Sequence, residues 1–177
     1  MNNDLSSQDS LPEETGGKAR GRSYARLAAV QALYEMDIAG AGSEAVLRDF
    51  LANRWAGTLI GNKDDEGNNA GAPVKTDHEL LSELVQGVSG RSEELDLLIA
   101  PALSGDRDLE RMETLLKAIF RAGTFELVDH DKIPAKIIIS EYVDIAHAFF
   151  SGPEPGLVNG VLDNLARTLR PDDFEAK

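Results

Sequence analysis

The stretch DRDLERMETLLKAIFRAGTFELVD, residues 106–129, carries the clearest structural signal in the sequence. Its apolar residues recur every three or four positions, the spacing that places side chains on one face of an α-helix. The stripe consists of Leu109, Met112, Leu116, Ile119, Gly123 and Leu127. We therefore expect an amphipathic helix over 106–129 that packs against other helices along this face.

The sequence on either side of this stretch predicts five further helices from the same spacing. The run KIII at 136–139 could form a strand, but its apolar pattern continues for fifteen positions, which favours a helix. No repeated alternation of apolar and polar residues indicates a sheet. We expect the five helices at about 19–40, at about 44–60, from Thr76 to just before Pro101, from Pro134 to Phe149, and from after the segment SGPEPG at 151–156 to Pro171.

The fold class expected from these elements is all-α, a helical bundle of about six to seven helices in two small subdomains. Thr76 and Glu79 have capping-box spacing at the start of the third helix. Glu141 and Arg121 are candidates for an ion pair between helices. Polar segments divide the chain into a flexible acidic tail at 1–17, the N-terminal basic helix and second helix at 18–60, a surface loop at 61–76, a helical bundle core at 77–171 and a C-terminal tail at 172–177.

Composition excludes several classes of protein. The 177 residues include no cysteine, which rules out disulfides, thiolate metal sites and cysteine nucleophiles. No apolar run is long enough to cross a bilayer and no apolar signal segment is present, so we expect a cytoplasmic protein without a membrane partner. We expect no cofactor and no bound metal. The net charge of −13 argues against nucleic-acid binding by the chain as a whole, so such a role requires a local basic surface.

A local basic cluster lies at the start of the first predicted helix, where Lys18, Arg20, Arg22 and Arg26 occur without an acidic residue among them. A rotation of about 100° per residue brings Arg22, Arg26 and Tyr34 to one face, and we expect the arginines to project beyond the core. Guanidinium groups bind phosphate oxygens through two hydrogen bonds, and an aromatic ring can stack on an unpaired base. Cations at a helix N-terminus are disfavoured by the helix macrodipole. A role in binding would explain why they occur there. The alternative is ordinary solvated charges and a core tyrosine.

Three stretches resemble the NusB family of bacterial transcription antitermination factors: AVQALYEMD at 29–37, LLKAIFRAGTFELVDHDKIPAKIIISEYVDIAHAFF at 115–150 and LVNGVLDNLARTLRP at 157–171. Their order and spacing also match, and the resemblance covers about residues 20–171 apart from the loop. It implies two small helical bundles and binding to the boxA element of nascent ribosomal RNA transcripts. It also implies a heterodimer with NusE, a small-subunit ribosomal protein, that binds boxA better than the factor alone, and association with the transcription elongation complex.

The resemblance implies which residues contact RNA. The family's arginine-rich N-terminus corresponds here to Lys18, Arg20, Arg22 and Arg26, and the tyrosine of its ALY motif corresponds to Tyr34.

A second RNA contact is implied at the start of the last helix. The family often has an aromatic residue just before VNGVLD, where this chain has Leu157, which allows apolar contact but not stacking. Asn159 of the same motif is a further candidate, with helix capping or cross-linking as the alternative. Pro153 and Pro155 lack an N–H, so neither can donate a backbone hydrogen bond to RNA.

Three competing functions have some support in the sequence. His78, His130–Asp131, and Asp144 or Asp163 occur in the order of metal-dependent His–Asp phosphohydrolases, but His130 and Asp131 precede a helix instead of lying on one. Ribosomal RNA methyltransferases with a NusB-like domain need a glycine-rich cofactor loop after a strand and a cysteine, and this chain has neither. A helical adaptor that binds only protein, or a homodimer, is the third. We expect a protein that is not an enzyme.

Overall fold

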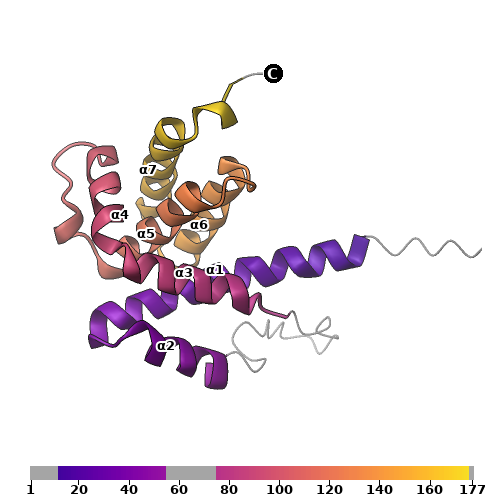
Figure 1. Ribbon diagram of the computed structural model, residues 1–177. Coiled ribbons are helices and arrows are strands. Elements are labelled where there is room, and N and C mark those ends of the chain that lie inside the picture. The colour runs from indigo at the N-terminus through magenta and orange to yellow at the C-terminus, as the bar shows by residue number, and fades with distance from the viewer. Residues whose placement is uncertain (1–11, 55–74, 176–177) are drawn as a thin grey trace, which may run out of the picture.

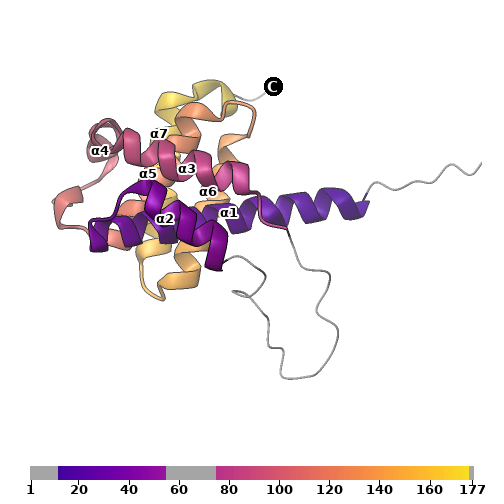
Figure 2. The ribbon, with the colours of Figure 1, turned by 60° about the horizontal axis from the view of Figure 1, so that its bottom comes forward.

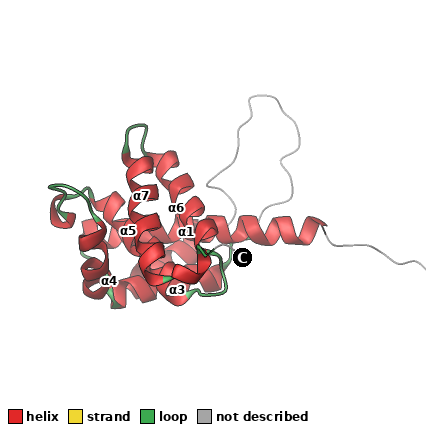
Figure 3. Cartoon of the chain, turned by 90° about the horizontal axis from the view of Figure 1, so that it is seen from above, coloured by secondary structure: helices red, strands yellow, loops and turns green. Residues whose placement is uncertain are grey.

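The fold is all-α, as the sequence predicts. The computed structural model describes residues 12–54 and 75–175, and within these ranges it contains seven α-helices and no strand (Figures 1 and 3). The helices are α1 (Pro12–Ala39), α2 (Ser43–Asp49), α3 (His78–Gly90), α4 (Ser92–Ile99), α5 (Thr114–Asp129), α6 (Ala135–Phe149) and α7 (Glu154–Leu169). A π-helical turn follows α2 at Phe50–Arg54, and short 3-10 turns lie at Ala100–Ala102, Leu109–Arg111 and Pro171–Asp173.

Two groups of helices pack around α5. α1, α2 and α3 form one group and α4, α6 and α7 the other, and α5 contacts both (Figure 1). α1 packs against α3 and α5, and α6 packs along α7. Figures 2 and 3 show α1 lying between α3 and the turn that joins α6 to α7. α5 is therefore common to both groups, and the buried apolar residues of the described helices form one continuous core.

α5 is the central helix because most of its length from Leu116 to Leu127 is buried. Gly123 allows α7 to approach closely, since a Cβ atom at this position would lie 2.9 Å from a methyl carbon of Leu162. The glycine in the predicted stripe therefore sets the distance between α5 and α7.

The predicted start of this helix at 106 is wrong. α5 begins at Thr114, and the preceding segment forms a short turn in which the Asp108 carboxylate accepts a hydrogen bond from a backbone N–H two residues later (3.0 Å). Leu109 and Met112 still pack against the core from this turn. The apolar spacing therefore runs through both the turn and α5, because a turn can also direct apolar side chains into the core.

The third predicted helix is divided at Arg91 into α3 and α4. Arg91 has φ −128°, outside the helical range. Its guanidinium donates to Glu94 (2.8 Å) and to Asp129 at the end of α5 (2.8 Å), which fixes the bend between the helices.

The N-cap of α3 is also not the predicted one. Asp77, not Thr76, caps the helix, and its carboxylate accepts a hydrogen bond from the N–H of Leu80 (3.0 Å). Glu79 lies in the first turn, and Thr76 is buried. An aspartate accepts this hydrogen bond as readily as a threonine, so the sequence offered two caps one residue apart.

α1 is longer and α2 shorter than predicted. α1 begins at Pro12 instead of near residue 19, and α2 ends at Asp49. Residues 1–11 of the predicted tail, 61–74 of the predicted loop and 55–60 of the second predicted helix lie outside the described residues. No helix in the described ranges combines the length and the apolar character that crossing a membrane requires.

Candidate nucleic-acid interface

The N-terminal part of α1 extends beyond the rest of the bundle (Figures 1 and 3). Residues 16–22 of this part are called the basic arm here, because they carry Lys18, Arg20 and Arg22, all of them exposed. At about 100° per residue, Lys18 and Arg22 lie on one side of the helix and Arg20 on the opposite side. Three of the predicted RNA-binding cations are therefore accessible to a ligand.

Arg22 has only a loose partner within the protein. Its Nε lies 3.7 Å from an oxygen of Asp77, and 44% of the Arg22 side chain is exposed. Ion pairs with this exposure are weak. A phosphate group can therefore replace Asp77 as the partner of Arg22 at little cost.

The expectation that Arg26 projects beyond the core is wrong. Arg26 is 3% exposed, and its guanidinium donates two hydrogen bonds to Glu126, from Nε (2.7 Å) and from Nη2 (2.8 Å). Burial opposes the charged form, but the hydrogen bond with Glu126 holds the pKa of Arg26 above its ordinary value. Contact with RNA would leave Glu126 buried without its cation, at a cost of about 3–5 kcal/mol. Arg26 therefore belongs to the interior and not to the RNA surface.

Glu126 is fully buried at the centre of this polar cluster. The Tyr142 hydroxyl donates to its Oε2 (2.7 Å), beside the two hydrogen bonds from Arg26. Burial alone would raise the pKa of Glu126, but hydrogen bonds from His130 and Arg26 lower it to about 2. Neither Glu126 nor Tyr142 was among the predicted site residues. The available signal was a carboxylate inside the apolar segment TFELV at 124–128, since a buried acid requires a partner.

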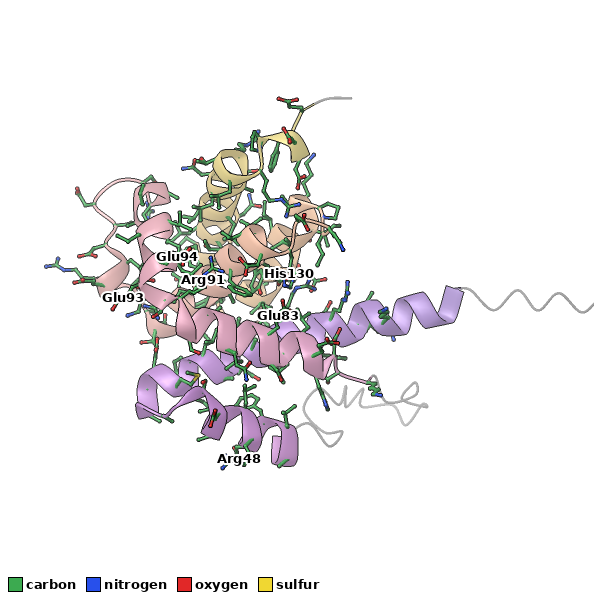
Figure 4. All side chains as sticks on the ribbon, viewed as in Figure 1. Arg48, Glu83, Arg91, Glu93, Glu94 and His130 are labelled. Carbon is green, nitrogen blue, oxygen red and sulfur yellow. The ribbon has the colours of Figure 1, made fainter. Side chains whose placement is uncertain are left out.

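His130 connects this cluster to α3. Its Nδ1 lies 3.4 Å from Glu126, and its Nε2 lies 3.1 Å from Glu83 on α3 (Figure 4). The hydrogen bond with Glu126 and, to a lesser degree, that with Glu83 raise the pKa of His130 above its ordinary value. Both ring nitrogens carry a hydrogen only when the imidazole is positively charged, so only then can His130 donate a hydrogen bond to both Glu126 and Glu83.

The predicted ion pair between Glu141 and Arg121 is wrong. Arg121 donates to Asp96 on α4 (2.8 Å). Glu141 on α6 instead accepts a hydrogen bond from Ser23 (2.9 Å) and lies 3.4 Å from Arg26. α6 is therefore connected to α1 at the point where the basic arm begins.

Tyr34 lies toward the other end of α1 and is 38% exposed. The helical rise of 1.5 Å per residue places it about 18 Å along the helix from Arg22. Arg26 and Tyr34 were predicted on one face, yet the first is buried and the second exposed. The basic arm and Tyr34 are thus two separate parts of α1 that a ligand lying along the helix can reach.

Of the two predicted residues of α7, Leu157 lines a groove and Asn159 does not. Asn159 is exposed, and Leu157 is partly buried. Leu157 helps to line a groove of about 750 Å³ between the start of α7 and the segment that joins α4 to α5. Met112, Leu116 and Val161 contribute apolar side chains to this groove.

Charged residues also line this groove. Three are acidic and two basic: Asp106, Asp108, Glu154, Arg107 and Arg111. An apolar floor with charges of both signs around it is typical of a surface that binds a protein partner.

The described residues contain no group of three or more His, Asp or Glu side chains that could hold a metal ion. Two of the residues suggested for a phosphohydrolase site, His130 and Asp163, have other partners. His130 contacts Glu83 and Glu126, and Asp163 accepts a hydrogen bond from Arg167 (2.7 Å).

The sequence profile of the NusB family matches residues 23–167, which is most of the chain. The chain belongs to the NusB family. Two relatives named transcription antitermination protein NusB support this: that of Rhodospirillum rubrum is 41% identical, covering 93% of both chains, and that of Caulobacter vibrioides is 40% identical, covering 88% of this chain and 99% of the relative. Members are antitermination factors and not catalysts, so the expectation of a protein that is not an enzyme is confirmed.

Solved NusB structures have the same fold. NusB from T. maritima superposes with a TM-score of 0.68 at 23% identity, covering 88% of this chain and 97% of that one. A crystal structure of NusB and NusE in complex with double-stranded RNA gives a TM-score of 0.65 at 23% identity, covering 84% and 98%.

Proposed function

We propose that this NusB-family protein is an RNA-binding transcription antitermination factor that recognises the boxA element of nascent ribosomal RNA transcripts together with NusE. The observation that carries the proposal is the exposure of three cations on an arm that extends from an otherwise acidic protein. The relatives' name supports the antitermination role, and the solved complex of a protein of the same fold supports RNA and NusE as ligands. The role places the protein in the cytoplasm with the elongation complex.

The basic arm supplies the phosphate contacts in this proposal. Lys18, Arg20 and Arg22 bind phosphate oxygens, and guanidinium groups do so with two hydrogen bonds each. Three contacts to single-stranded RNA give a salt slope of roughly −2, because each contributes about −0.7. RNA binding by the protein alone is therefore modest.

Tyr34, Leu157 and Asn159 contact bases in this proposal. The Tyr34 ring is exposed enough to stack on a base, and Leu157 offers an apolar contact. The exposed Asn159 amide can both donate and accept hydrogen bonds at a base edge.

NusE is proposed to bind at the groove between the start of α7 and the α4–α5 segment. Leu157 borders this groove, so a protein bound there lies beside a proposed RNA contact. A partner in this position can add its own contacts to the same RNA, so we expect the pair to bind RNA more tightly than the NusB-family protein alone.

The alternative is a helical adaptor that binds only protein, or a homodimer. Leu97 on α4 and Ile38 on α1 are 76% and 62% exposed, and a protein partner could cover them. RNA binding that is unaffected by loss of the arm cations would favour this alternative.

A titration of labelled RNA tests the proposed function. A boxA RNA and a scrambled RNA of the same base composition are each titrated with the protein, with and without NusE. We expect weak binding to boxA alone, at least a tenfold gain with NusE, about 1.4 kcal/mol, and weaker binding of the scrambled RNA. Equal binding of the two RNAs in the presence of NusE contradicts boxA recognition.

A further inference from the structure

We propose that Ser23 and Glu141, together with the buried pair of Arg26 and Glu126, form a clamp that sets the direction of the basic arm. This inference rests on the proposed function, because it makes Ser23 and Glu141 positioning residues for RNA binding. Neither residue needs to touch the RNA. The four residues are called the arm clamp below.

The first side of the clamp is Glu141 on α6. Its Oε1 accepts a hydrogen bond from the Ser23 hydroxyl (2.9 Å), and its Oε2 lies 3.4 Å from a guanidinium nitrogen of Arg26. Ser23 and Arg26 are three residues apart and so lie on one face of α1. One carboxylate therefore holds a full turn of α1, at the base of the arm.

The second side of the clamp is the rigid attachment of Arg26. Glu126 accepts two hydrogen bonds from Arg26 at 2.7 and 2.8 Å, and both side chains are buried. Two parallel hydrogen bonds fix the orientation of the guanidinium group as well as its position. Arg26 therefore attaches this turn of α1 to α5, and Glu141 attaches the same turn to α6.

The opposite side of α1 is held by the segment that leads into α3. The N–H of Asp77 donates to the carbonyl oxygen of Gly21 (3.1 Å). A Cβ atom at Gly21 would lie within 2.4 Å of the carbonyl oxygen of Lys75, so only glycine permits this approach. α1 is thus fixed between two elements just where the arm leaves the bundle.

The arm beyond the clamp has little support of its own. Added Cβ atoms at Gly16 and Gly17 would meet no other atom within 4 Å. Lys18 lies about 12 Å along the helix from Arg26, so a tilt of about 20° at the clamp moves Lys18 by about 4 Å. A shift of this size breaks a contact between an ammonium group and a phosphate. The direction of the arm therefore controls whether its cations meet the RNA together.

The charge of Glu141 makes the inference sharply testable. Glu141 is an anion next to the arm, so removing it should strengthen RNA binding if only its charge matters. The clamp predicts the opposite result. Asp144, exposed and one turn further along α6, provides the matched control, because its removal changes the charge equally without removing a hydrogen bond or ion pair to α1.

The first measurement is boxA RNA affinity in the presence of NusE. We expect Glu141→Ala to weaken RNA binding about fivefold, which corresponds to a loss of about 1 kcal/mol of binding free energy. Asp144→Ala should leave binding unchanged or slightly tighter, and Glu141→Gln, which can still accept from Ser23, should fall between Glu141→Ala and the parent. Equal or tighter binding by Glu141→Ala overturns the inference.

The second measurement reports the arm directly and does not depend on RNA. The chain has no cysteine, so Ala19→Cys and Lys136→Cys introduce one pair of spin labels, on the arm and on α6. We expect a narrow distribution of the distance between the two labels in the parent and in Asp144→Ala, and a broad distribution in Glu141→Ala. Saturating RNA should narrow the distribution of Glu141→Ala. An unchanged width with Glu141→Ala overturns the clamp. If the parent shows a narrow distribution but binds no RNA, the proposed function fails while the clamp stands.

Discussion

At the scale of single residues, partners decide which cations of α1 are available. Lys18 and Arg20 are exposed, whereas Arg26 is buried and donates two short hydrogen bonds to Glu126. Arginines four residues apart in the sequence, Arg22 and Arg26, thus have different roles. The outer one can bind a ligand, and the inner one holds the helix.

The first prediction concerns the buried pair. Glu126→Ala leaves the Arg26 charge buried without a partner, so it should lower the free energy of unfolding by about 3–5 kcal/mol. Denaturant titration measures the change. Asp163→Ala, which removes the exposed partner of Arg167, is the control and should have little effect. A Glu126→Ala protein as stable as the control contradicts the assigned role of the pair.

The second prediction concerns pH and His130. The folded-state pKa of His130 is raised by Glu126 and Glu83, so protonated His130 stabilises the fold below its unfolded pKa of about 6.5. This stabilisation is lost as the pH rises through the folded-state pKa. The free energy of unfolding of the parent and of His130→Gln is measured between pH 5 and 8. The parent should be the more stable at low pH, and the difference should shrink as the pH rises. An advantage that grows with pH contradicts this sign.

The sequence could not reveal that Arg26 faces inward. Its partner Glu126 is 100 residues away, and the spacing of apolar residues carries no information about a contact at that distance. The exposure of Lys18, Arg20 and Arg22 was predicted correctly, but the absence of acidic residues among the four cations did not distinguish them from the buried Arg26. The carboxylate at Glu126 inside an apolar segment was a usable signal that a buried cation exists.

At the scale of helices, apolar spacing was sufficient where a helix is continuous. α6 and α7 lie close to their predicted ranges. The spacing failed where a polar contact interrupts a helix, as at Arg91, which binds Asp129 across the fold. Asp108 caps the start of a separate short turn before α5 through a local hydrogen bond, so the predicted helix is interrupted there as well. The predicted RNA residues of α7 were placed by motif, and their groove depends on packing that the spacing does not describe.

The third prediction uses two glycines of α1. Gly21→Ala forces a methyl group against the backbone of the segment before α3 and should destabilise the protein by about 1–3 kcal/mol. Gly17→Ala meets no other atom and should be neutral or stabilising, because alanine favours a helix. Thermal unfolding of the two variants provides the comparison. Equal melting temperatures contradict the close approach at Gly21.

At the scale of the whole molecule, an acidic protein presents a small basic surface. The net charge of −13 disfavours binding to nucleic acid in general. The arm extends beyond the bundle, which increases the distance between its cations and the acidic surface (Figure 1). In the proposed function, selective binding of one RNA then depends on a few contacts and on a second protein.

The central claim is that Lys18, Arg20 and Arg22 bind the RNA backbone. The most direct test is the salt dependence of boxA RNA binding, with NusE present, for the parent and for the triple substitution of these residues by alanine. We predict that the logarithmic slope becomes less negative by roughly 2, about 0.7 per lost contact, and that Arg48→Ala on α2 leaves it unchanged. An unchanged slope in the triple variant would contradict the account.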